Sequence, residues 1–161
     1  AVDMIVKRLP DERASLSGPC ATKGTPLAGL APRNLAAQLT AVLDIDPVVA
    51  SGMARRLGSL AWTAATTARR RAELKPLEPD SDLCAAEVRG HLRHGAVLHL
   101  EDLLLRRVRI GMWHPARSAE LVRRLRPIVR SELGWDWRRW KTEEQGYLEA
   151  LRAWTLEGVR N

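Results

Sequence analysis

The chain has 161 residues, of which 45% are hydrophobic and 28% charged, a composition that fits one globular domain and excludes an intrinsically disordered chain. The formal net charge of +7 raises nucleic acid, phosphate and lipid headgroups as partners, but the arginines are spread along the chain instead of forming a basic tail. Two cysteines, Cys20 and Cys84, are too few for a secreted disulfide scaffold. No apolar run reaches the roughly 18 residues of a membrane span. We therefore expect a cytoplasmic protein.

Residues 1–33 are predicted to be the end of a connecting helix followed by a linker loop. Apolar residues recur at helical spacing over 1–9, and Pro10 stops that helix. Ala1 is neither an initiator Met nor an N-cap, so we expect the chain to start inside a helix. The glycines and prolines of residues 10–33 predict a loop whose length indicates that it lies against another part of a larger protein.

Residues 34–161 are predicted to form an all-α domain, a small multi-helix bundle, because good helix formers dominate and β-branched clusters are few. The first helix follows Asn34. The second has Asp46 as its N-cap and Pro47 at its first position, and Gly58 closes it. The apolar stripes of these two helices hold Leu35, Leu39, Val42, Leu43, Val49, Met53 and Leu57.

A third helix is predicted to open at Ser59 and to carry a stripe of small residues, which lets a neighbouring helix approach closely. A break over residues 74–82 comes next, then a helix from about Asp82 to His94 and another over about 101–108. The small residues of the third helix are Ala61, Ala64, Ala65, Ala68 and Ala72.

Two long helices are predicted to complete the domain. The first covers residues 115–133, with Pro127 expected to kink it and Gly134 to end it. The start of the last helix stays open between the neighbourhood of Asp136 and a capping box at Thr142. Its predicted buried residues are Trp140, Tyr147, Leu148, Leu151 and Trp154.

No catalytic, cofactor-binding or metal-ligating residue is predicted. Glu87, His91 and His94 share one helical face and could hold a divalent metal, but the sequence offers no matching second motif, so chance placement is favoured. The chain also has no glycine-rich phosphate loop, no nucleophile motif and no βαβ pattern for FAD or NAD.

Two charged segments allow a functional and a structural interpretation. Asp102 and Arg106 stand four residues apart on a helix and predict an ion pair. Together with Arg107 and Arg109 they could form an anion contact or a docking clamp. The favoured interpretation is an internal salt-bridge network that ties the helix to the bundle. The Trp-Arg segment 135–140 could stack on bases or lie at a membrane interface, but indoles that cap the core under packed arginines are favoured.

Four segments between Glu87 and Trp135 carry a family resemblance: Glu87-Val-Arg, Glu101-Asp102-Leu-Leu-Leu-Arg106-Arg107, Gly111-Met112-Trp113 and Leu133-Gly134-Trp135. With them, the chain resembles the C-terminal domain of the FAD-dependent glycerol-3-phosphate dehydrogenases and the related glycerophosphate oxidases. Thr22-Lys23 and residues 27–29 look like the linker of that family, and residues 1–9 look like the helix that leaves its flavin domain.

The resemblance implies a parent enzyme that oxidises sn-glycerol 3-phosphate to dihydroxyacetone phosphate. Hydride passes to FAD, and electrons go on to a membrane quinone or, in the oxidases, to oxygen. It also implies that the flavin and nearly all substrate contacts belong to the N-terminal part, so this chain is a non-catalytic cap that binds no FAD itself.

The partner implied by the resemblance is the flavin-binding domain of the same parent chain, at the cytoplasmic side, with the inner face of the membrane as a further surface. Asp102, Arg106, Arg107, Arg109 and Trp113 are carried over as motif residues with a structural or docking role. The alternative is a stand-alone basic helical module that binds nucleic acid through residues 69–71 and the arginine-rich helix at 117–130.

Overall fold

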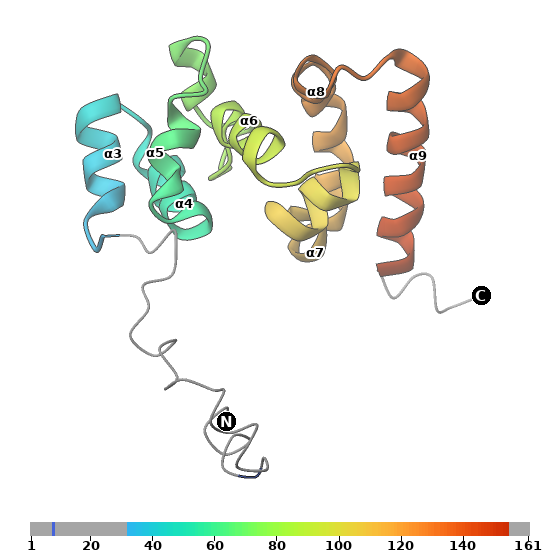
Figure 1. Cartoon of the computed structure of the whole chain (residues 1–161), viewed down its shortest axis with the longest axis horizontal. Helices are drawn as coiled ribbons and strands as arrows, with labels where there is room; N and C mark the ends of the chain where they lie inside the picture. Colours follow the sequence, from blue (N-terminus) through green and yellow to red (C-terminus); the bar gives the residue numbers. More distant parts are fainter. Residues whose placement is uncertain (1–7, 9–31, 155–161) are drawn as a thin grey trace. The chain divides into compact units, whose positions relative to one another are not determined.

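The computed structural model describes residue 8 and residues 32–154 (Figure 1). The helix predicted over 1–9 and nearly all of the loop predicted over 10–33 lie outside the described residues. Within residues 32–154 the chain is helical, which confirms the all-α prediction; the β-structure there is an isolated bridge between Pro76 and Cys84. The elements are α3 (Leu35–Leu43), α4 (Pro47–Leu57), α5 (Leu60–Ala65), the 3-10 turn η1 (Arg71–Leu74), α6 (Ala85–His94), the π-helical turn η2 (Asp102–Arg107), α7 (Ile110–Trp113), α8 (Pro115–Leu133) and α9 (Trp137–Trp154).

Side-chain caps set several helix ends. The Asp46 carboxylate accepts the Val48 N–H at 2.8 Å ahead of Pro47, as predicted for the start of α4. The Asp136 carboxylate accepts the Arg139 N–H at 2.7 Å, so α9 begins beside Asp136. Of the two starts that the sequence left open, the capping box is therefore the wrong one.

Helix α6 separates two hydrophobic clusters. It contacts α5 on one side and α8 on the other, and every residue from Ala85 to Leu92 is buried (Figure 1). The N-terminal cluster is Leu35, Leu39, Ile45, Val49, Ala50, Met53, Ala61, Ala64, Ala65, Leu74, Cys84 and Ala86. The C-terminal cluster is Leu83, Ala85, Val88, Leu92, Val97, Leu100, Leu103, Leu104, Leu105, Val108, Leu121, Val122, Leu125, Ile128, Val129, Trp140, Tyr147 and Leu151.

The small residues of α5 allow the close approach that the sequence predicted. A Cβ atom on Gly90 of α6 would lie 2.6 Å from the Cβ of Ala64, which leaves room for glycine alone without a shift. The prediction that this helix extends to Ala72 is wrong, because α5 ends at Ala65. The Thr67 hydroxyl lies 2.7 Å and 2.8 Å from the carbonyl oxygens of Ala64 and Ala86, and this contact fastens the turn to α6.

Other predicted details are wrong at the edges of the bundle. Val42 is 68% exposed and Trp154 is 61% exposed, because the buried faces of α3 and α9 stop at Leu39 and Leu151. Helix α6 begins at Ala85, not near Asp82, since the preceding residues are extended and bridge to Pro76.

The two longest described helices follow the sequence closely in extent. Helix α8 runs from Pro115 to Leu133 through Pro127, and Gly134 follows it with a φ of 65°. Neither α8 nor α9, nor any other helix within residues 32–154, is long and apolar enough to cross a membrane. The short helix α7 was not predicted.

Candidate functional site

The segment from Asp102 to Trp113 combines two uncommon backbone features. The Val108 N–H donates to the Leu103 carbonyl at 2.8 Å, five residues back, and this bond closes the π-helical turn η2. Arg109 follows in the left-handed region, with a φ of 62°. Few non-glycine residues adopt that conformation, and here it changes the direction of the chain between η2 and α7.

Asp102 ties the loop before η2 to the start of that turn. Its carboxylate accepts the N–H groups of His99 at 2.9 Å and Leu98 at 3.1 Å. Burial by itself would raise the pKa of Asp102, but these two hydrogen bonds and the charge of Arg106 outweigh it and hold the pKa below its ordinary value. The carboxylate is therefore a fixed anion of the turn.

The ion pair predicted between Asp102 and Arg106 is present. The Arg106 guanidinium lies 2.9 Å from the carboxylates of both Asp102 and Glu101. These bonds stay within one segment, so the favoured interpretation, a network that ties this helix to the bundle, is wrong for Arg106. The pair closes the turn on itself.

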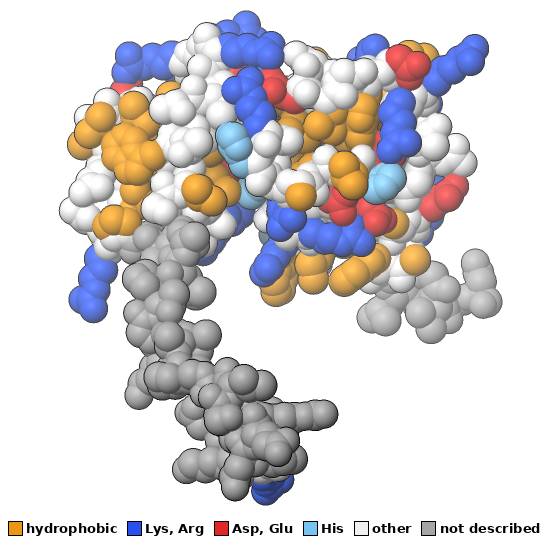
Figure 2. All heavy atoms as spheres, in the orientation of Figure 1, with side chains coloured by type: hydrophobic (Ala, Val, Ile, Leu, Met, Phe, Trp, Pro, Cys, Tyr) orange, Lys and Arg blue, Asp and Glu red, His pale blue; other side chains and the backbone are white. Residues whose placement is uncertain are grey.

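Arg107, Arg109, Met112 and Trp113 form an exposed surface, which we call the η2–α7 surface. Trp113 is 73% exposed and Met112 is 42% exposed. Within residues 32–154, no hydrogen bond, ion pair or ring contact involves the guanidinium group of Arg107 or Arg109. Figure 2 shows basic and hydrophobic side chains gathered beside α7.

Helix α7 is seated on the C-terminal cluster through Gly111. A Cβ atom at Gly111 would lie 2.6 Å from the Tyr147 hydroxyl and 2.7 Å from the Leu105 side chain. The Tyr147 hydroxyl hydrogen-bonds the buried Ser118 of α8, and burial raises the pKa of Tyr147. The glycine thus lets α7 lie against the Tyr147 hydroxyl and η2, while Met112 and Trp113 remain exposed.

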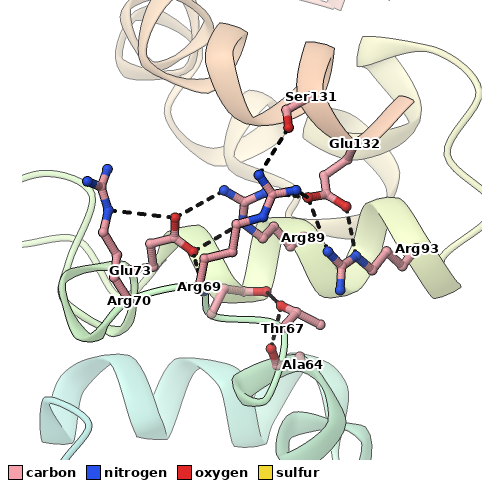
Figure 3. Close-up of polar contacts among 10 residues, drawn as sticks. Ala64, Thr67, Arg69, Arg70, Glu73, Arg89, Arg93, Ser131 and Glu132 are labelled. Carbon is pink, nitrogen blue, oxygen red and sulfur yellow. Dashed lines mark hydrogen bonds and ion pairs between the residues drawn. The ribbon is translucent and has the colours of Figure 1, made fainter. Parts of the chain in front are cut away.

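A cluster of charges, here called the ionic junction, joins the η1 segment, α6 and α8; Arg89 and the two carboxylates are buried, while Arg69 and Arg93 are exposed (Figure 3). It consists of Arg69, Glu73, Arg89, Arg93 and Glu132. Arg89 donates to Glu73 at 3.0 and 3.1 Å and also bonds Glu132. Glu132 in turn accepts from Arg93 at 2.7 Å and from Arg69 at 2.8 Å. The junction therefore links both hydrophobic clusters across α6.

These contacts keep both carboxylates ionised. Hydrogen bonding from Arg93, opposed by burial and helped by Arg89, lowers the pKa of Glu132. Burial alone would raise the pKa of Glu73, but the bonds from Arg89 and from the Arg69 N–H outweigh burial and lower it. The junction is thus an arrangement of full charges whose bonds would be lost on unfolding.

A second ionic contact joins α4 to α6. Arg56 donates to the Glu87 carboxylate at 2.6 Å and to Asp82 at 2.7 Å. Burial alone would lower the pKa of Arg56, but these partners outweigh it and raise the pKa. The Glu87 carboxylate also lies 3.6 Å from Nε2 of His91. Within residues 32–154, no group of three or more metal-type ligands lies together.

Most of the arginines considered for nucleic-acid binding have partners within the protein. Arg69 bonds Glu132, Arg70 lies 3.9 Å from Glu73, and Arg71 pairs with Asp44. On α8, two of the arginines, Arg117 and Arg124, reach Glu78. This pairing reduces the positive surface that a phosphate backbone would need.

The Trp-Arg segment packs as the favoured interpretation predicted. Trp140 is fully buried, and the ring centroids of Trp135 and Trp140 lie 6.5 Å apart. The Arg139 guanidinium lies over the Trp135 ring. Trp137 has three cations within 5.2–5.7 Å of its ring centroid, from Arg126, Arg130 and Lys141. Trp140 is therefore part of the core, while Trp137 is 46% exposed and is partly covered by cations of the same chain.

Two further features carry little chemistry. The buried Cys84 thiol has a pKa raised to about 12 by burial, so it stays protonated at neutral pH and is a poor nucleophile.

A groove of about 950 Å³ runs between α8 and α9. Its charged lining mixes both signs, with Arg123, Arg126 and Lys141 beside Glu144 and Glu149. Such a lining offers no single charge to an ionic substrate.

The sequence interpretation missed the ionic junction and the Arg56 contact. Their partners are separated by 16 to 63 residues along the chain, so no local spacing joins them. The signal that could have indicated them is the sequence of α6, where Glu87 and Arg89 stand among small and apolar residues on every side.

The chain matches a known protein family. Residues 20–140 match the family model described as the C-terminal domain of alpha-glycerophosphate oxidase. No curated protein and no solved structure matches the chain.

Proposed function

The chain belongs to the family of C-terminal domains of alpha-glycerophosphate oxidase, and from that premise we propose that it is the non-catalytic cap domain of an FAD-dependent glycerol-3-phosphate dehydrogenase. The parent enzyme oxidises sn-glycerol 3-phosphate to dihydroxyacetone phosphate and passes electrons through FAD to a quinone. The cap packs on the flavin-binding part and supplies no group to the reaction.

The family match over residues 20–140 is the observation that carries this proposal. The fold supports it, since a βαβ unit of the kind that binds dinucleotides does not occur within residues 32–154. The flavin belongs, on this proposal, to the N-terminal part of the parent protein. The buried charges, by contrast, have evident roles in joining helices.

The test compares the 161-residue chain with the whole parent protein. We expect the purified chain to carry no flavin absorbance, and the whole protein to carry FAD that is reduced anaerobically by sn-glycerol 3-phosphate. The coding sequence upstream of Ala1 should specify Gly-x-Gly-x-x-Gly between a strand and a helix. A flavin bound by the isolated chain, or a parent protein without flavin, would overturn the proposal.

The electron acceptor needs a separate measurement. With the whole protein and sn-glycerol 3-phosphate, rapid reduction of a soluble quinone and little oxygen consumption would support the dehydrogenase. Stoichiometric oxygen consumption would instead assign the parent to the oxidases of this family.

Nucleic-acid binding is the weaker alternative, because the residues 69–71 pair with Glu132, Glu73 and Asp44. We expect a DNA titration at several salt concentrations to show weak binding. Tight binding with a steep salt dependence would favour the alternative.

A further inference from the structure

We infer that the η2–α7 surface is the place where this chain docks on the flavin-binding part of its parent protein, against a patch that carries carboxylates around an apolar pocket. The inference rests on the proposed function, which supplies the partner, while the surface and its chemistry come from the structure. No residue of the surface is given a part in the reaction.

The charges of this surface are uncompensated. Arg107 and Arg109 are exposed and have no carboxylate partner among residues 32–154. Most other arginines of the described part are paired, including Arg106 directly beside them. Arginines without an internal partner favour a protein surface with carboxylates, which accept forked hydrogen bonds from guanidinium groups.

The apolar part of the surface is also uncovered. Trp113 is 73% exposed and has no ring contact within residues 32–154, whereas Trp137 has three cations over its ring. Trp, Met and Arg are the residue types enriched at protein interfaces, and buried Trp side chains often dominate the binding energy. Arg123 also lacks a carboxylate partner in the described part, but it lines a groove of mixed charge with no exposed aromatic residue.

The backbone holds this surface in a fixed orientation. Arg109 has a φ of 62° between η2 and α7, and Gly111 is pressed against Tyr147 and Leu105. Strained conformations of this kind persist where the surroundings hold them and are common at functional sites. A surface ordered before binding loses little side-chain and backbone freedom on docking.

A second copy of this chain is a poor occupant. Among the described residues, only Asp80 and Glu120 have a carboxylate with neither an ion pair nor a hydrogen bond. These two residues lie on different elements, so a second copy offers no acidic patch to receive Arg107 and Arg109. Two copies of the η2–α7 surface would set arginine against arginine.

The remaining segments of this chain are poor occupants too. Residues 1–31 hold three acidic and four basic side chains, and residues 155–161 hold one of each, so neither segment is acidic. A lipid surface is also less suitable, because binding to anionic lipids uses clusters of about four to eight cations and this surface has two.

Hydrogen–deuterium exchange of the unmodified proteins tests the inference. The amides of residues 106–114 should exchange at least tenfold more slowly in the whole parent protein than in the 161-residue chain. Residues 141–146 of α9 are the internal control and should exchange equally in both. Equal exchange of 106–114 in a whole protein that oxidises sn-glycerol 3-phosphate would overturn the docking surface and leave the proposed function standing.

Anionic phosphatidylglycerol vesicles provide the second arm. Protection of residues 106–114 that appears only when vesicles are added would overturn docking on protein and assign the surface to lipid. A parent protein without flavin or activity towards sn-glycerol 3-phosphate would instead contradict the proposed function and remove the partner on which the inference rests.

Paired variants of the whole protein give an independent test. Arg107→Glu with Trp113→Ala should abolish most of the protection of residues 106–114, a loss of tenfold or more. The matched control, Arg123→Glu with Trp154→Ala, also changes one exposed arginine and one exposed tryptophan. It should leave the protection of residues 106–114 unchanged. Unchanged far-ultraviolet circular dichroism would show that both variants fold, and equal protection in both would overturn the inference.

Discussion

The ionic junction and the η2–α7 surface use arginine in opposite ways. In the junction, Arg89 is buried between two carboxylates and connects helices that lie far apart in the sequence. At the surface, Arg107 and Arg109 are exposed and connect nothing within residues 32–154. An arginine-rich composition therefore does not by itself indicate an anionic partner, because the partner of each arginine depends on its place in the fold.

The comparison also separates stability from recognition. A buried charge that loses its partner is strongly destabilising, while an exposed residue that contacts nothing has little effect on folding. Changes in the junction should therefore lower stability, and changes at the η2–α7 surface should affect docking alone.

Arg89→Ala is expected to have the largest effect. It leaves the buried carboxylate of Glu73 without its bidentate cation and removes one of the three arginines that contact Glu132, so the free energy of unfolding should fall by about 3–5 kcal/mol. Urea unfolding of the 161-residue chain measures this change. Arg107→Ala is the matched control and should stay within about 0.5 kcal/mol of the unmodified chain. Similar values for the two variants would remove the distinction between these regions.

Gly111→Ala should have a smaller effect at the seat of α7. The added methyl group would lie 2.6 Å from the Tyr147 hydroxyl, and overpacking of this kind costs about 1–3 kcal/mol. Gly146→Ala is the control, since no atom lies within 4 Å of its Cβ position and alanine favours a helix interior by about 1 kcal/mol. Thermal unfolding should therefore move in opposite directions, and a stabilised Gly111→Ala chain would contradict the close packing of α7.

Acid should weaken the junction gradually. Glu73 and Glu132 have pKa values below the ordinary value, so they contribute stability above that value and lose it as the pH falls through their folded-state pKa values. The free energy of unfolding should decrease as the pH drops below about 4.3, the ordinary pKa of Glu. Urea unfolding at a series of pH values measures it. The Arg89→Ala chain should show a shallower decrease, and equal slopes would argue against the junction as the source.

Trp113→Ala should have the smallest effect on folding. The side chain is 73% exposed, so the free energy of unfolding of the 161-residue chain should change by less than about 0.5 kcal/mol. Trp140→Ala makes the contrast, because Trp140 is fully buried and its loss should cost about 3–5 kcal/mol. Urea unfolding of both variants gives the comparison; a large loss at Trp113 would place that indole in the fold instead of at an interface.

Much of the local structure could be predicted from residue patterns. The extent of α8, the N-cap of α4 at Asp46 and the ion pair between Asp102 and Arg106 follow from spacing within a few residues. The family resemblance placed on residues 87–135 agrees with the match over 20–140. The exposure of Trp154 and the early end of α5 could not be predicted, because both depend on where a neighbouring helix stops.

The sequence alone determined the all-α class, most helix boundaries and the family, since capping, helical period and short motifs act over a few residues. Only the tertiary structure decided which charges are buried and which are free. Arg89 and Arg107 are both helical arginines next to apolar residues, yet one meets Glu73 and Glu132 and the other meets solvent. The physical reason is that a charge is stabilised by whatever lies within a few ångströms in space, and chain distance does not report that neighbourhood.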